Sequence, residues 1–141
     1  MPEPRIISMQ PMQPMLLVEP ETMLRRTVAL TARSLGLADI HEAASPALGR
    51  QMLRRQSFAG AIIAINAGDA YDLGLLDQIR EGDTISSRSM PIAVLAVNCT
   101  GELLAALRQR AVSRVIVKPF RARILLDAFS ALAAPPLEAE G

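Results

Sequence analysis

Five short apolar runs alternate with five amphipathic stretches along most of this chain, and no other feature restricts the fold as strongly. The runs cover residues 15–18, 40–44, 61–65, 92–97 and 115–117. They contain β-branched residues and little polar alternation, which is typical of strands buried on both faces of a parallel sheet. The second run is the weakest, because it includes His41 and Glu42. The pattern therefore predicts five mostly buried strands.

The stretches between the runs have helical spacing and recognisable ends. We expect Thr22 to cap the first helix and Gly36 to end it. Ser45 followed by Pro46 predicts the start of a second helix that runs to about residue 56, and Thr100 predicts the start of a fourth. The inward faces of four of the helices are expected to carry Leu24, Val28 and Leu35; Leu73, Leu76 and Ile79; Leu103, Leu104 and Leu107; and Leu125, Leu126, Phe129 and Leu132.

Strands and helices in strict alternation, with short connections, predict an α/β fold. Right-handed crossovers would then build a doubly wound, five-stranded parallel sheet with five helices on its two faces. The length of 141 residues suits one domain with one core. We expect this domain to span residues 15–134, between a flexible, Pro- and Met-rich tail at residues 1–14 and a disordered tail at residues 135–141. Either Met1 or Met15 can be the true start.

The composition argues against several classes of protein. A single cysteine, Cys99, excludes an internal disulfide and a cysteine-based metal cluster. No apolar run approaches the ~18 residues of a membrane span, and the opening segment has no signal-peptide core, so the cytoplasm is the expected location. A net charge of +1 and 3% aromatic residues disfavour nucleic-acid binding. Enzymatic activity is not expected, because no nucleophile–base pair, Gly-rich phosphate loop or metal-ligand cluster is found.

Basic residues are concentrated near the end of the chain. Residues 100–127 carry six bases and only two acids. Five of these bases are arginines on the predicted fourth helix, fifth strand and fifth helix: Arg108, Arg110, Arg114, Arg121 and Arg123. A second apolar line of Ile124, Ala128 and Ala131 follows the fifth helix. A small apolar strip rimmed by arginines is typical of a protein-contact surface, although a simply solvated basic face remains an open alternative.

Polar residues follow four of the five runs, at the edge where a doubly wound sheet binds ligands. In order along the chain, and at the spacing of the family, these segments resemble the CheY-like receiver domain of response regulators across residues 15–133. The resemblance rests on Leu16-Leu17-Val18-Glu19-Pro20-Glu21, residues 58–80, Met90-Pro91-Ile92 and Lys118-Pro119-Phe120. It implies the strand order 2-1-3-4-5 and a cis peptide bond before Pro119.

The resemblance also implies a phosphorylation pocket, but this chain has lost most of it. In the family, acids after the first strand and an aspartate ending the third bind Mg²⁺, and that aspartate accepts the phosphoryl group. Here Glu19 takes the first acid position, whereas Pro20 takes the second and has no carboxylate. Spacing from Phe58 and from the third helix places Ala64 at the nucleophile position, and a shift by two would place Asn66 there. Neither side chain is a useful phosphoacceptor.

Two further positions of the pocket have also lost the family's residue, and one has kept it. The family's hydroxyl after the fourth strand corresponds to Ala96, and its switching aromatic corresponds to Val115. Only Lys118 matches, and it is the single lysine among fifteen basic residues. We expect it to form a structural ion pair with Glu19 or Glu21. Mg²⁺ prefers one or two carboxylates together with phosphate oxygens. Glu19, with or without Glu21, is a poor remnant of such a site, so no cofactor is expected.

These observations predict a stand-alone regulator in bacterial two-component signalling that acts without phosphorylation. Its expected partners are a histidine kinase, another regulator or an output protein, or a second copy of the chain. The contact face would be the fourth helix, fifth strand and fifth helix, and it would include Val115 and Ile124 with the five arginines. The alternative is that these arginines bind an anionic second messenger such as a cyclic dinucleotide, because guanidinium groups suit phosphates and stack on bases.

Overall fold

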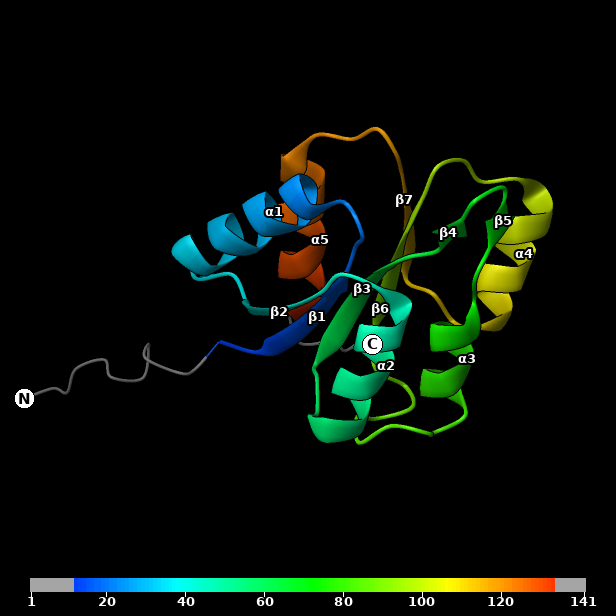
Figure 1. Ribbon diagram of the computed structural model, residues 1–141, viewed down its shortest axis with the longest axis horizontal. Helices are drawn as coiled ribbons and strands as arrows, with labels where there is room; N and C mark the ends of the chain where they lie inside the picture. Colours follow the sequence, from blue (N-terminus) through cyan, green and yellow to red (C-terminus); the bar gives the residue numbers. More distant parts are fainter. Residues whose placement is uncertain (1–11, 134–141) are drawn as a thin grey trace, which may run out of the picture.

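The computed structural model describes residues 12–133 and contains a five-stranded parallel sheet (Figure 1). Its strands are β1 (Pro14–Val18), β2 (Asp39–Ala43), β3 (Gly60–Ala64), β6 (Ile92–Ala96) and β7 (Arg114–Val117). They lie in the order β2-β1-β3-β6-β7, and all neighbouring pairs are parallel. This order is the predicted 2-1-3-4-5 arrangement, so the predicted fold is confirmed.

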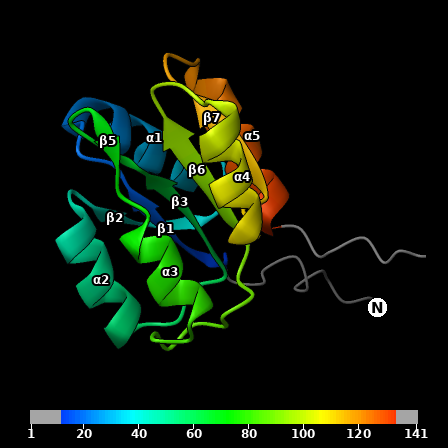
Figure 2. The ribbon, with the colours of Figure 1, turned by 90° about the vertical axis from the view of Figure 1, so that its right-hand side faces the viewer.

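Helices cover both faces of the sheet (Figure 2). The helices α1 (Thr22–Ser34) and α5 (Ala122–Ala133) pack against one face. The other face is covered by α2 (Pro46–Arg55), α3 (Gly74–Arg80) and α4 (Gly101–Gln109). Because all five strands are parallel, their carboxyl ends lie at one edge of the sheet.

The sheet divides the core into two layers. Leu16 and Val18 of β1 pack under α2 and α3, whereas Met15 and Leu17 pack under α1 and α5 together with Phe129. All five of these side chains are completely or almost completely buried. Because both faces of the strand are covered, every position is apolar, which explains why the sequence shows short continuous runs and no alternation.

Several predicted helix ends are confirmed, and one is corrected. The Ser45 and Thr100 hydroxyls accept the backbone N–H groups of Leu48 and Leu103, as N-caps should. Thr22, however, does not cap α1, because it is the first helical residue. The N-cap position is occupied by Glu21, whose side chain makes no capping hydrogen bond.

The end of α1 differs from the predicted inward face. Leu35 lies at the C-cap and is 61% exposed, so it is not part of the core. Gly36 follows with φ +69°, which confirms the predicted helix end.

A β-hairpin that the sequence did not predict joins β3 to α3. Its strands are β4 (Asn66–Ala67) and β5 (Ala70–Tyr71), which pair antiparallel around Gly68. Gly68 has φ +63°, a conformation that glycine adopts without strain in a tight turn.

The Arg80 side chain ties three separate segments together at the opposite end of the sheet. Its guanidinium donates hydrogen bonds to the carbonyls of Arg88, Met90 and Arg110 at 2.7 Å each, and to Ala111 at 3.1 Å. These carbonyls belong to the loop before β6 and to the turn after α4. Burial lowers the pKa of this guanidinium, which nevertheless stays charged at neutral pH.

The predicted domain boundaries fall mostly outside the described residues. The tail expected at residues 135–141, and residues 1–11 of the other tail, lie beyond residues 12–133. The strand β1 begins at Pro14, one residue before the predicted domain start. No helix in the described part of the chain is long and apolar enough to cross a membrane.

Candidate functional site

The candidate site lies at the carboxyl edge of the sheet. The four strands β1, β3, β6 and β7 end there at Val18, Ala64, Ala96 and Val117. Two charged residues follow directly, Glu19 after β1 and Lys118 after β7. Lys118 N–H donates to the carbonyl of Ala96, and Glu19 N–H donates to the carbonyl of Ala43, so the neighbouring strands hold both residues.

Glu19 and Lys118 form a buried ion pair. The Lys118 Nζ atom lies 2.7 Å from Glu19 Oε1, and the glutamate side chain is only 1% exposed. Glu19 Oε2 accepts the N–H of Glu21 at 2.9 Å. Oε1 has no hydrogen-bond donor of suitable geometry among residues 12–133, so the Lys118 ammonium is what compensates its charge. The predicted structural ion pair is confirmed, with Glu19 as the partner.

This ion pair spans the middle of the sheet. The strands β1 and β7 are separated by β3 and β6, and three strand spacings correspond to roughly 14 Å. The two long side chains therefore reach toward one another over the ends of β3 and β6, where Ala64 and Ala96 stand. Each of these two positions contributes only a methyl group.

The side chains predicted to occupy the family's reactive positions are methyl, isopropyl and pyrrolidine groups. Ala64 is half-buried opposite Leu95, and Ala96 is buried at the end of β6. Pro20 is exposed and has no carboxylate, and Val115 is half-buried against the core layer beneath α2, α3 and α4. An alanine methyl cannot attack phosphorus.

Asn66, the alternative nucleophile position, is already engaged in the fold. Its Oδ1 accepts the N–H of Val97 at 2.7 Å. Among the described residues, no three His, Cys, Asp or Glu side chains are grouped as a metal ion would require. That no Mg²⁺ binds here remains a prediction.

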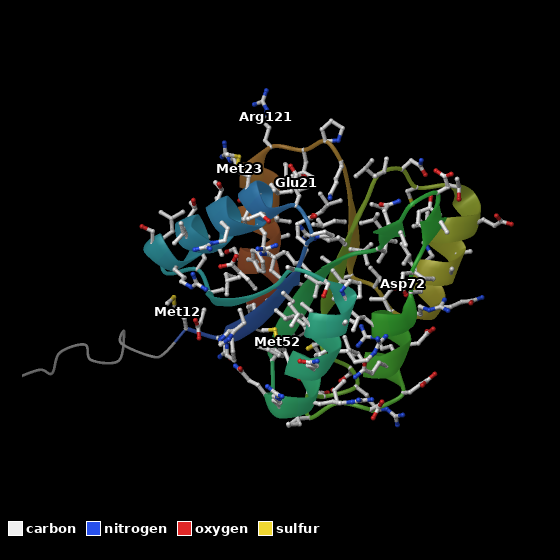
Figure 3. The ribbon with its side chains drawn as sticks, viewed as in Figure 1. Met12, Glu21, Met23, Met52, Asp72 and Arg121 are labelled. Carbon is white, nitrogen blue, oxygen red and sulfur yellow. The ribbon has the colours of Figure 1, made fainter. Side chains whose placement is uncertain are left out.

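A shallow hollow of about 400 Å³ lies beside the ion pair. It is lined by Glu21, Leu24, Val97, Lys118, Pro119 and Phe120. Four of these six side chains are apolar, and the Lys118–Pro119 bond is cis, as the resemblance implied. Figure 3 shows Glu21 and Met23 at the start of α1 and Arg121 before α5 at the same end of the molecule.

The structure brings only some of the predicted basic face together. Arg108, Arg114, Arg121 and Arg123 are exposed, and none forms an ion pair with another residue in the described range. Neither of the two described hollows is lined by these arginines.

Two predicted members of this face are placed elsewhere. Arg110 donates to Asp77 Oδ1 at 2.7 Å and to the Ala106 carbonyl at 2.9 Å, so its side chain binds α4 to α3. Ala128 is completely buried beneath α5 and is not part of an outer strip, whereas Ile124 is 46% exposed. Of the predicted apolar line, Ile124 and Ala131 are exposed, and Val117 on β7 is 45% exposed.

Comparison with solved structures connects this architecture to known proteins. The receiver domain of HemR from Leptospira biflexa superimposes with a TM-score of 0.76 at 15% identity, over 88% of this chain and 96% of that one. The fold is that of a receiver domain. Vibrio cholerae CheY4 gives a TM-score of 0.74 at 19% identity, over 86% and 98% of the two chains. HP1043, an orphan response regulator of H. pylori, gives 0.73 at 17%, over 89% and 99%.

No family model matches the sequence of this receiver-like chain, and no curated protein matches it. The identities with the solved receiver domains are all below 20%, so the likeness is one of fold.

Proposed function

We propose that this chain is a receiver-fold regulator in two-component signalling that acts by protein contact and without phosphorylation. The observation that carries the proposal is the Lys118–Glu19 pair, which reaches across the ends of β3 and β6 at the place where a receiver would hold a phosphoryl group. The lysine that would bind phosphoryl oxygens is already neutralised by Glu19, and Ala64 offers no nucleophile. The role is one of binding and not of catalysis.

The proposed contact face combines Arg114, Arg121 and Arg123 with Val117 and Ile124. The three arginines are exposed and form no ion pair within residues 12–133, so they are available to an acidic partner. Val117 and Ile124 add an apolar centre, and such a centre with a charged rim is the usual composition of a protein interface. The proposed partner is a histidine kinase, another regulator, an output protein or a second copy of this chain.

Removing the rim charges tests this proposal. In the R114A/R121A/R123A variant we expect binding to an identified signalling partner to weaken about 10- to 100-fold, since each exposed charge contributes ~0.5–1 kcal/mol. The fold should persist, because all three side chains are exposed. Calorimetry with and without a small phosphodonor and Mg²⁺ should give the same affinity for the unmodified chain.

The matched control is R54A/R55A, which removes two exposed arginines from α2, on the other face of the sheet. It should bind the partner normally. Equal weakening by both variants would show only a general charge effect. An affinity that rises with the phosphodonor would contradict phosphorylation-independent action.

A further inference from the structure

The β4–β5 hairpin is bound to the loop that leads into α4. Asn66 and Tyr71 face one another across the hairpin, and both make hydrogen bonds to consecutive residues after β6. Asn66 Oδ1 accepts the N–H of Val97 at 2.7 Å, and the Tyr71 hydroxyl donates to Asn98 Oδ1 at 2.6 Å. One hairpin rung therefore holds the exit from β6 at two adjacent points.

The first of these bonds extends the sheet. The N–H of Ile65 donates to the carbonyl of Leu95 as the last rung between β3 and β6. Beyond that point β3 turns away into the hairpin, and the Asn66 side chain supplies the acceptor that the backbone no longer offers. Asp72 N–H closes the hairpin onto the carbonyl of Ile65 at 2.7 Å. The hydrogen bonds of Asn66 and Asp72 therefore continue directly from the backbone ladder between β3 and β6.

The hairpin also packs against α4. Tyr71 and Leu73 line a small hollow together with Leu103 and Ala106 of α4. Tyr71, Leu73 and Cys99 contact the core layer that contains Leu103. Polar bonds therefore hold the loop at its beginning, and apolar contacts hold the helix that follows.

We propose that this hairpin is a clasp that keeps residues 97–100, and with them the start of α4, in a single conformation. Tyr71 is its positioning residue, because its hydroxyl donates the only side-chain hydrogen bond that Asn98 receives from residues 12–133. The clasp fixes the connection between β6 and α4. The surface formed by α4 and β7 is therefore available to a partner without a prior conformational change. The clasp restrains the domain itself, whether or not the arginine face binds a partner.

Amide hydrogen exchange on the full chain tests the clasp. In Y71F we expect the amides of Val97 and Asp72 to exchange about 5- to 10-fold faster, which is the effect of losing one hydrogen bond on a local opening. The amide of Glu19, bonded to Ala43 on the far side of the sheet, should exchange at an unchanged rate. In the unmodified chain, residues 97–100 should show no millisecond exchange by NMR relaxation dispersion.

Two further variants separate a clasp from a general structural contribution. N98A removes the acceptor and should match Y71F, and the double variant Y71F/N98A should exchange no faster than either alone. D69N, at the exposed hairpin turn, should leave all rates unchanged. An unchanged rate at Val97 in Y71F would overturn the proposal. So would an equal increase at Glu19, because it would mean that Tyr71 stabilises the whole domain and does not restrain the loop.

Discussion

Replacing Lys118 with methionine is expected to lower the free energy of unfolding by about 2–4 kcal/mol. Methionine keeps much of the length and the apolar stem of lysine but leaves the Glu19 carboxylate, 1% exposed, without its counter-charge. Removing one partner of a fully buried pair costs about 3–5 kcal/mol. The cost here should be smaller, because the Lys118 side chain is 25% exposed and Glu19 also accepts an N–H from Glu21. Urea denaturation measures the change.

The double variant E19Q/K118M is the control for this prediction. Glutamine has nearly the shape of glutamate and carries no charge to be compensated, so most of the lost stability should return. The two substitutions should therefore be strongly non-additive. A K118M variant as stable as the unmodified chain would show that water and not Lys118 compensates Glu19.

Replacing Arg80 with alanine is expected to cost about 2–4 kcal/mol of stability. The substitution removes four hydrogen bonds to backbone carbonyls, donated by a charged group, and hydrogen bonds of this kind are individually stronger than neutral ones. The loop before β6 and the turn after α4 would lose their common anchor. Thermal and urea unfolding, with unchanged m-values, would report the loss.

R80K and R54A are the variants whose loss of stability is compared with that of R80A. Lysine offers a single ammonium and cannot reach four carbonyls at once, so R80K should fall between the unmodified chain and R80A. Arg54 pairs with Asp83 at 3.2 Å, but both side chains are more than half exposed, and R54A should cost less than about 0.5 kcal/mol. An R80A variant no less stable than R54A would contradict the anchoring role.

The sequence predicted the sheet because its strands are buried on both sides. Residues 15–18 and 92–97 are continuous apolar runs for the same reason that Leu16 and Leu17 both lie in the core, on opposite faces. The ion pair was also predictable, since Lys118 and Glu19 follow strands that end at one edge. The strand order places the ends of β1 and β7 on either side of β3 and β6, so Glu19 and Lys118 face one another across that edge.

The sequence did not reveal interactions between side chains from distant segments. Arg110 differs from its exposed neighbours because it forms an ion pair with Asp77, 33 residues earlier. No local sequence pattern identifies that partner. Ala128 has no size or polarity that would distinguish an outer from an inner position on α5, so its inclusion in the outer apolar line was wrong. Tyr71 carried no signal of its own, because its partner Asn98 belongs to another loop.

Intact-mass spectrometry after incubation with acetyl phosphate and Mg²⁺ tests most directly whether this receiver fold works without phosphorylation. A phosphorylatable receiver domain treated in parallel serves as the positive control. The predicted result is an unchanged mass for this chain, because Ala64 provides no nucleophile and Lys118 is held by Glu19. A stoichiometric adduct of one phosphoryl group, labile to hydroxylamine as an acyl phosphate is, would contradict it.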